Sequence, residues 1–485
     1  MLGRKKFEPK LMYAVSLEDL IPEDNFYKKI NGLLDLRFIY KECKAIYGKT
    51  GNPSIDPVVF IKINLFGYFE NIIGDRELIR KASDSLSARY YLGYDIDEEL
   101  PWHSTISRTR ALMKEELYEK IFNEVLKMCV EAGLVSGDHQ SVDSTLVKAN
   151  ASLESLEKKR PALRLTEYIK KTIDENKTEE KDDNEIGKPK AEIKGVKNPA
   201  GGKKTKRSNK YYTSKTDPDS RIAKKPGKKT DLYYTTHYSV DSKSKVITDV
   251  LTTHSDIADS DTMMEVVERA AERLENCGLE IQSVAADKKY RSGENLRELE
   301  QRGIVPYVPT QEHPNTTGGI SKEKFRYDKE KDEYVCPNNK ILRYRYITKR
   351  RAKTYSCNLL DCKNCPIKVS CSPGKKSRKV QHSIYLDEYE RLEKRLRTPL
   401  GKRAMILRKT GPEPLFGEAK LYHGLKKFMT KGKDKAQKNS FMIATIQNLK
   451  RLIKCINHKK IKAGSTSYLE NIIYSLKYHF AFCLN

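Results

Sequence analysis

The chain has 485 residues, and its 93 lysines and arginines outnumber 66 aspartates and glutamates to give a formal net charge of +27 at pH 7. This balance favours a polyanionic partner, nucleic acid above all, over a small-metabolite substrate, although lysines spread over every surface would give the same total. No segment approaches the roughly 18 apolar residues of a membrane helix, and the start MLGRKKFEPKLMYAVS lacks the apolar core of a secretion signal, so we expect a cytoplasmic protein of two or three domains without membrane contact.

Residues 1–130 are predicted to form an all-α N-terminal domain. In SIDPVVFIKINLFGYFENIIG, Asp56 is placed to cap a helix, Pro57 occupies its first turn, and apolar residues recur at helical spacing. The segments DRELIRKASDSLSARYYLG and HSTISRTRALMKEELYEKIFNEVLKMCVEAG continue the pattern. The helical domain is our first candidate for DNA binding.

The second of these segments opens near Ser104 or Thr105, either of which is a suitable helix cap. Arg108, Arg110 and Lys114 lie near helical spacing within it. They could contact the backbone of DNA, but a solvated basic face explains the same pattern.

A catalytic domain is expected at residues 134–455. It begins with a strand in LVSGDHQSVDSTLVKA and a hairpin of DLYYTTHYSVD and VITDVLTTHS, followed by a helix, the strand IQSVAAD, a second helix and the strand IVPYVP. This order is typical of an α/β domain with a mixed sheet, as in ribonuclease-H-like nucleases. We expect two insertions in it, a flexible basic one at 153–230 and a cysteine-rich one at 322–380, and a C-terminal tail at 456–485.

Two of the predicted strands carry a carboxylate, Asp143 near the centre of the first in QSVDST and Asp287 at the end of the second in SVAADKK. One such aspartate is usually a turn or cap residue. Two on strands that lie side by side in this topology favour a shared role at one crevice. Phosphodiester chemistry supplies a reason, because carboxylates hold the Mg²⁺ ions that activate the attacking oxygen and stabilise the leaving one.

A third carboxylate is predicted in RKTGPEPLFGEAKLYHGLKKFM, where Glu413 and Glu418 are the candidates. Glu413 precedes Lys420 by seven residues, about two helical turns, so one face would carry a metal ligand and a phosphate-binding amine. Glu418 has no lysine at that offset. Alternatively, Glu413 only stabilises a helix N-terminus and Lys420 is solvated.

Five of the ten cysteines crowd into one region of the sequence. Cys362 and Cys365 form a C-x2-C half-site for zinc, with Cys336 and Cys371 as the further ligands. Cys357 could replace one of them or be a bystander. Such a zinc ion would staple the insertion rather than take part in catalysis. The chain has neither a GxxxxGK[ST] loop nor a GxGxxG turn, so ATP is not implied.

Several motifs in order, PWHSTISRTR, VDSTLVKANAS, KTDPDSRIAKKPGKKTDLYYTTHYSVD, AADKKYRSGEN and PEPLFGEAKLYHGLKKFMTKG, resemble bacterial insertion-sequence transposases of the DDE class. The resemblance covers nearly the whole chain and is strongest to the eleven-eighty-two family, with relatives in the four and five families. It implies that Asp143, Asp287 and Glu413 are catalytic ligands of Mg²⁺ or Mn²⁺. It also implies that Lys420 matches the lysine that follows the glutamate after six residues, and that similar proteins carry the four cysteines.

The chain departs from the four family's Tyr-x2-Arg-x3-Glu-x6-Lys signature, because Ile406 and Lys409 stand at the tyrosine and arginine positions. Arg408 could substitute for that arginine; Arg408, Lys409 and Lys420 are therefore our candidates for DNA contacts near the site. The resemblance implies a protein of the bacterial cytoplasm and nucleoid, acting as a homodimer on terminal inverted repeats and target DNA. The alternatives are a ribonuclease-H-like nuclease that cuts without joining and an inactive DNA-binding descendant.

Overall fold

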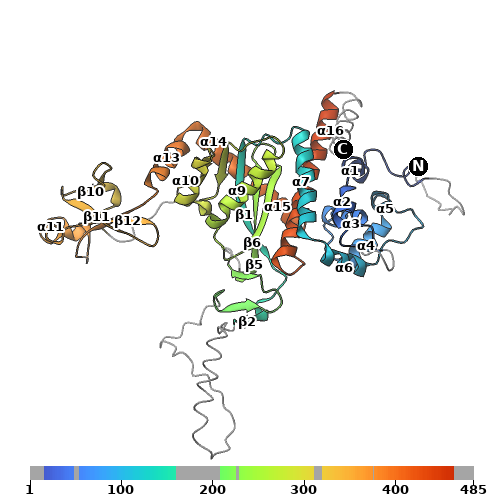
Figure 1. Ribbon diagram of the computed structural model, residues 1–485, viewed down its shortest axis with the longest axis horizontal. Coiled ribbons are helices and arrows are strands. Elements are labelled where there is room, and N and C mark those ends of the chain that lie inside the picture. Colours follow the sequence, from blue (N-terminus) through green and yellow to red (C-terminus); the bar gives the residue numbers. More distant parts are fainter. Residues whose placement is uncertain are drawn as a thin grey trace, which may run out of the picture.

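The computed structural model describes residues 16–47, 54–159, 208–224, 229–310, 319–374 and 376–463. Figure 1 shows three parts along the longest axis: a group of helices from the N-terminal region, a central sheet flanked by helices, and a small outlying sheet. The structure is therefore mixed α/β with a helical N-terminal region, as the sequence predicts. Residues 1–15, most of the predicted basic insertion (160–207 and 225–228) and the end of the predicted tail (464–485) lie outside the described residues.

The N-terminal region consists of short helices, whose bounds are α1 (Phe26–Leu33), α2 (Phe38–Cys43), α3 (Pro57–Phe69), α4 (Asp75–Asp84), α5 (Leu86–Leu92), α6 (His103–Leu112) and α7 (Glu115–Glu131). Asp56 caps α3 as predicted, because its carboxylate accepts from the amides of Val58 and Val59. The prediction of a Ser104 or Thr105 cap is wrong. The cap position of α6 is Trp102, and both hydroxyl residues lie inside the helix.

The central sheet joins strands from distant parts of the chain, namely β1 (His139–Lys148), β4 (Arg221–Ala223), β5 (Asp231–Asp241), β6 (Ile247–His254), β7 (Ser283–Ala286) and β8 (Val305–Tyr307). β5 pairs antiparallel with β1, β4 and β6, whereas β7 runs parallel to both β1 and β8. The sheet is therefore mixed. The inner strand β5 is buried along most of its length, and its neighbour β1 is buried at half of its residues.

Helices cover the sheet, with bounds α9 (Asp259–Glu275), α10 (Gly293–Gln301), α13 (Leu386–Arg397), α14 (Pro399–Thr410), α15 (Pro412–Tyr422) and α16 (Lys433–Ala463). The predicted hairpin, the helix after it and the two following strands are all present. α16 continues across residue 455, where the tail was expected to begin.

The long helix α16 covers the edge strand β6 with side-chain amides. Gln437 accepts from the backbone N–H of Thr252 and donates to the carbonyl of Val250. Asn448, three turns further along, forms the same pair of bonds with the backbone of Ile247, both of 2.8 Å. An uncovered edge strand would expose unpaired backbone groups, so α16 closes the sheet on this side. α7 packs on the same helix (Figure 1), which ties the N-terminal region to the sheet.

Parts of the predicted basic insertion are ordered elements, so the expectation of one flexible segment over 153–230 is wrong at both ends. A 3-10 turn at Leu153–Ser155 leads into β2 (Leu156–Lys158), which pairs with β3 (Tyr212–Ser214), and β4 joins the central sheet. Buried Asp217 accepts from the Tyr234 hydroxyl at 2.6 Å and from the Gly432 amide. These bonds fold a polar segment that has few apolar residues of its own.

The cysteine-rich insertion forms the outlying sheet, whose strands in order are β13 (Lys379–Ser383), β12 (Ala352–Cys357), β11 (Ile341–Ile347), β10 (Glu333–Val335) and β9 (Arg326–Asp328). The short helices α11 (Leu359–Lys363) and α12 (Lys368–Cys371) complete it. It has a small core of its own, separate from the main core, in which Tyr334, Leu342 and Tyr355 are buried. Across the described part of the chain, no helix is long and apolar enough to cross a membrane.

Candidate active site

Asp143 and Asp287 lie next to each other where β7 leaves the sheet. β1 and β7 pair in parallel over only four residues, ending with Val142 opposite Ala286. Asp143 directly follows Val142, and Asp287 directly follows Ala286. β1 continues beyond this point to Lys148 without β7 beside it. Both aspartates therefore lie at the carboxyl end of a parallel strand pair, the position at which open α/β sheets bind ligands in a crevice.

The Asp143 carboxyl has a pKa raised to about 6. Burial is the main cause, and the nearby negative charges of Asp287 and Glu413 raise it further. The backbone N–H of Ser144, 2.8 Å from the carboxylate, and the guanidinium of Arg408 act in the opposite direction. The charges of Asp287 and Glu413, which come from separate elements, thus both act on Asp143.

Glu413 is brought to the crevice by the turn between α14 and α15. Gly411 in that turn packs on β1, because a side-chain carbon there would lie 3.6 Å from the Cβ of Ser141, and it would also lie only 3.1 Å from the Leu407 carbonyl. Pro412 then starts α15 and Glu413 lies exposed in its first turn. The helix is anchored on the sheet by Phe416, which stacks on Tyr238 of β5 with 4.4 Å between ring centroids.

Lys420 lies two turns further along α15, and its ammonium group donates to the hydroxyl of Thr145 on β1. Thr145 is two residues beyond Asp143, so both side chains belong to the same face of the strand. Helix α15 therefore runs beside the part of β1 that carries Asp143 and Thr145, with Glu413 at its start and Lys420 two turns later.

Glu418, the other glutamate of α15, is held in an ion network away from this face. It accepts from the Arg451 guanidinium at 3.1 Å and from the Gln447 amide at 3.2 Å, and the His423 ring lies 3.6 Å away. Burial by itself would raise the pKa of Glu418, but the interactions with His423, Arg451 and Gln447 outweigh it and lower the pKa to about 2. Glu418 thus links α15 to α16.

Arg408 and Lys409 have different environments. Arg408 is buried, with its guanidinium 3.8 Å from Asp287, so it is a charge partner of the crevice within the protein. Lys409 is exposed, as is Ile406, whose side chain is 62% accessible. The two positions that depart from the four-family signature therefore both face solvent on α14.

The opposite face of β1 carries a buried polar network that the sequence did not reveal. Ser144 donates to Asp259 at the start of α9 at 3.1 Å, and His237 on β5 lies 4.0 Å from the same carboxylate. The His237 ring is 2.7 Å from the hydroxyl of Tyr290, and burial lowers its pKa to about 3, so the ring is neutral. Because Tyr290 closes the 3-10 turn Lys288–Tyr290, the network fixes the chain just after Asp287. The histidine in DLYYTTHYSVD is the feature of the sequence that could have indicated this network.

The carboxylates of Asp143, Asp287 and Glu413 offer hard oxygen donors, which are the ligands that suit Mg²⁺ or Mn²⁺. Asp143 and Asp287 are partly buried with Arg408 as a nearby positive charge, which leaves an excess of negative charge that a cation would offset. The side chains as placed are not a closed ligand set. In the part of the chain that the structure describes, no group of three or more histidine, cysteine, aspartate or glutamate side chains is arranged to hold a metal ion.

The five cysteines of the outlying domain converge on one small cavity, which is lined by Cys336, Cys357, Cys362, Cys365 and Cys371. The backbone N–H of Lys340 donates to the Cys336 sulfur at 3.3 Å, and the Asn338 amide lies 3.5 Å from the Cys365 sulfur. The sequence predicted the convergence of four of them. Burial raises the pKa of Cys357 to about 12, and the Cys362 thiol next to it adds to this effect.

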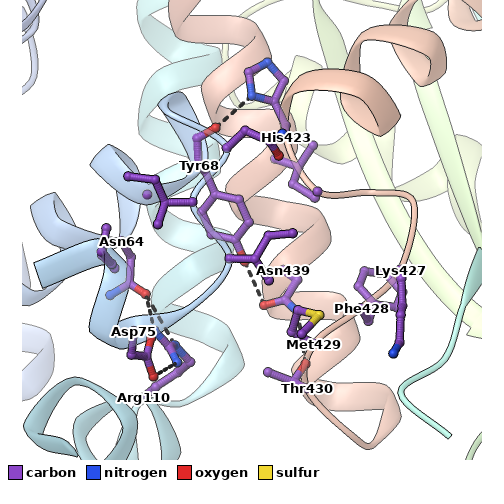
Figure 2. A pocket seen from close by; sticks show the side chains of 17 residues that line it. Asn64, Tyr68, Asp75, Arg110, His423, Lys427, Phe428, Met429, Thr430 and Asn439 are labelled. Carbon is purple, nitrogen blue, oxygen red and sulfur yellow. Dashed lines mark hydrogen bonds and ion pairs between the residues drawn. The ribbon is translucent and has the colours of Figure 1, made fainter. Parts of the chain in front are cut away.

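Arg110, one of three predicted DNA contacts in α6 and its surroundings, is used inside the protein. Figure 2 shows it in a pocket between the N-terminal helices and the segment after α15, where it forms an ion pair with Asp75 at 2.7 Å and bonds to Asn64. Tyr68 crosses the same pocket and donates to Asn439 of α16 at 2.8 Å. Arg110 is therefore a structural residue, whereas Arg108 and Lys114 are exposed.

Comparison with known protein families gives two matches. Residues 15–112 match a family model described as a transposase domain (DUF772), and residues 335–453 match one described as a transposase DDE domain. No curated protein shows a significant match to the chain. The two matches support an insertion-sequence transposase, a class of enzyme that acts on DNA, and DDE domains generally use divalent metal ions.

Replacing Asp143 by asparagine should stabilise the metal-free protein. The raised pKa means that ionising Asp143 in the folded state costs about 2–3 kcal/mol, from about 1.4 kcal/mol per pKa unit between 3.8 and about 6. This cost is fully present above the folded pKa and vanishes as the pH falls to the unfolded pKa. Urea unfolding with chelator present should therefore show Asp143→Asn about 2 kcal/mol more stable near pH 7.5 and no more stable near pH 4.

Magnesium provides the control for this measurement. Millimolar Mg²⁺ should stabilise the wild-type protein and leave Asp143→Asn nearly unaffected, because binding to the folded state alone shifts the unfolding equilibrium. If Asp143→Asn is less stable than wild type near pH 7.5 in chelator, the surroundings do not disfavour the ionised form of Asp143.

Arg110→Met should destabilise the protein by about 2 kcal/mol, because it leaves Asp75 half-buried without its charge partner. Arg108→Met on the exposed side of the same helix is the matched control and should change the free energy of unfolding by less than about 0.5 kcal/mol. Thermal unfolding followed by circular dichroism measures both. Equal effects of the two substitutions would contradict the structural assignment of Arg110.

Proposed function

We propose that the chain is a DNA transposase that cuts at the ends of an insertion sequence and transfers the freed 3′ ends to target DNA. The observation that carries this proposal is the meeting of Asp143 and Asp287 at the end of a parallel strand pair, with the charge of Glu413 acting on the same point. A ribonuclease-H-like fold for the central domain and membership of the eleven-eighty-two family are parts of the proposal. The two transposase-domain matches support it.

In this proposal Asp143, Asp287 and Glu413 hold Mg²⁺ or Mn²⁺. Bound divalent ions supply activation of the attacking oxygen and stabilisation of the leaving one, first for cutting and then for strand transfer. Exchange of one phosphodiester for another needs no nucleotide fuel, which agrees with the lack of an ATP-binding motif in the sequence.

The chain's own basic residues orient the DNA. Lys420, fixed next to the crevice by Thr145, holds a phosphate close to the reacting one, and exposed Lys409 contacts the backbone from α14. Arg408 is buried against Asp287, so its role is to position that carboxylate rather than to contact DNA. The N-terminal helices and the basic insertion bind the terminal repeats, and two copies of the chain bring two ends together.

The direct test incubates purified protein with labelled element ends, target DNA and Mg²⁺. A transposase gives both cleaved ends and strand-transfer products. Cleavage without joining would identify a nuclease, and binding without cleavage an inactive descendant. Asp143→Asn should retain binding and lose both products.

Glu413→Gln should lower the rate of cleavage by at least about 10³-fold with little change in stability, because the side chain is exposed and its proposed role is chemical. Glu418→Gln is the matched control on the same helix. It should keep most of the activity per folded molecule and lower the free energy of unfolding by about 1–3 kcal/mol, because Arg451 loses its charge partner. Single-turnover cleavage and urea unfolding measure the two effects, and the reverse pattern would exchange the roles of the glutamates.

The zinc site remains a prediction. We propose that Cys336, Cys362, Cys365 and Cys371 bind one structural Zn²⁺ after small movements around their common cavity, with the Lys340 N–H already donating to one sulfur. Elemental analysis of protein purified without added metal should find one zinc per chain. Cys362→Ser should lose it and Cys277→Ser, a matched thiol on another surface, should not. Zinc-free wild-type protein with unchanged stability would show that the thiols are only core residues.

A further inference from the structure

A broad groove lies beyond the crevice, at the far end of β1. Its walls come from the end of β1 and the segment after it, from residues 229–231 before β5, and from the loop between α15 and α16. It has a volume of about 680 Å³, which is within the range of ligand pockets, and it is open to solvent. Figure 1 places β2, which continues from this segment, beyond the end of the central sheet.

Four lysines line this groove, and they are Lys148, Lys229, Lys427 and Lys431. Asp231 is the one acidic residue among the described lining residues, and it forms an ion pair with Lys148. The remaining lining is mainly hydroxyl and amide side chains, namely Asn150, Ser152, Ser155, Thr216 and Thr230. Lysines with hydroxyl and amide groups around them are the residue types that contact phosphate and sugar in DNA complexes.

The backbone forces two of these lysines together. Lys148 and Lys427 form a parallel β-bridge, in which the Phe428 N–H donates to the Lys148 carbonyl at 2.9 Å. Asn150 reinforces the bridge by donating to the Met429 carbonyl at 2.7 Å. Like charges placed directly opposite each other on neighbouring strands destabilise a fold. Asp231 offsets the charge of Lys148, and a bound polyanion would offset the charge of Lys427 and the other lysines of the groove.

The groove lies further along β1 than the proposed active site, although Lys148 projects from the opposite face of the strand to Asp143 and Thr145. Along β1 the order is Asp143, then Thr145 with Lys420 bonded to it, then Lys148 with Lys427 beside it. Five residues of an extended strand span about 17 Å. One strand of duplex DNA carries a phosphate about every 3.4 Å along the helix axis, so the groove lies about five phosphates from the crevice.

We propose that the groove bounded by Lys148, Lys229, Lys427 and Lys431 binds the backbone of duplex DNA about five phosphates from the cleaved bond. This inference rests on the proposed function, because the distance is counted from the bond that the proposed active site would cut. It adds a second, sequence-independent anchor that fixes the distance between the held duplex and the reacting phosphate.

The test measures how the affinity for duplex DNA depends on salt, in chelator so that no chemistry occurs. The probe is a mixed-sequence duplex of about 30 base pairs, with salt varied between about 50 and 200 mM. The variant Lys229→Gln/Lys427→Gln/Lys431→Gln removes three exposed charges and keeps Lys148, whose ion pair supports the fold. The slope of log affinity against log salt should fall by about 2.7, or about 0.9 for each lost phosphate contact.

The matched control is Lys243→Gln/Lys363→Gln/Lys379→Gln. These lysines are equally exposed, but Lys243 follows the opposite end of β5 and the other two belong to the outlying domain. The control should keep the wild-type slope, and circular dichroism should show both variants folded. Equal slopes for the two triple variants would overturn the groove assignment.

A second measurement separates the groove from the proposed function. Neutral methylphosphonate linkages placed one at a time along a labelled element end should weaken wild-type binding most at about the fifth phosphate from the cut, and should have no added effect on the groove variant. If the wild type cleaves but no such position exists, the groove assignment fails and the transposase proposal stands. If the salt slope responds as expected but the wild type does not cleave, the groove stands as a DNA site and the proposed function fails.

Discussion

The electrostatic cost of placing Asp143 and Asp287 at the centre of a sheet is the constraint on which the rest of this structure depends. β7 leaves β1 after four pairs, and the next residue on each strand is an aspartate. Burial makes the ionised state of Asp143 unfavourable, and the neighbouring carboxylates add to this. A fold that only needed stability would place apolar residues there, which supports the proposal that the charges serve a metal ion.

Both faces of the sheet hold these carboxylates in place. On one face, Arg408 lies beside Asp287, and α15 rests on β1 and β5 through Phe416 and the Lys420 to Thr145 bond. On the other face, the network of Ser144, Asp259, His237 and Tyr290 fixes the turn that follows Asp287. Buried hydrogen-bonded networks of this kind make a local structure rigid, as the proposed metal-dependent reaction would require of these side chains.

α16 couples the distant parts of the molecule. Its amides satisfy the backbone of β6, its apolar face packs on α7, and its Arg451 forms an ion pair with Glu418 of α15. Through Asn439 it also reaches Tyr68 in the N-terminal helices. A helix that contacts the sheet, the N-terminal region and α15 at once keeps the proposed DNA-binding surfaces at set distances from the crevice.

The sequence by itself determined the elements that depend on local chemistry. Helical spacing and Asp56 located α3, the order of strands and helices predicted that β1 and β7 are neighbours, and the seven-residue spacing of Glu413 and Lys420 predicted their common direction on α15. Only the tertiary structure decided which charged groups remain available. Arg110 and Glu418 resemble their neighbours in sequence, but Asp75 and Arg451 use their charges, and the lysines of the groove come from three segments far apart in the chain. Ion pairs and grooves depend on long-range contacts, and no local pattern of residues records which partner a side chain will meet.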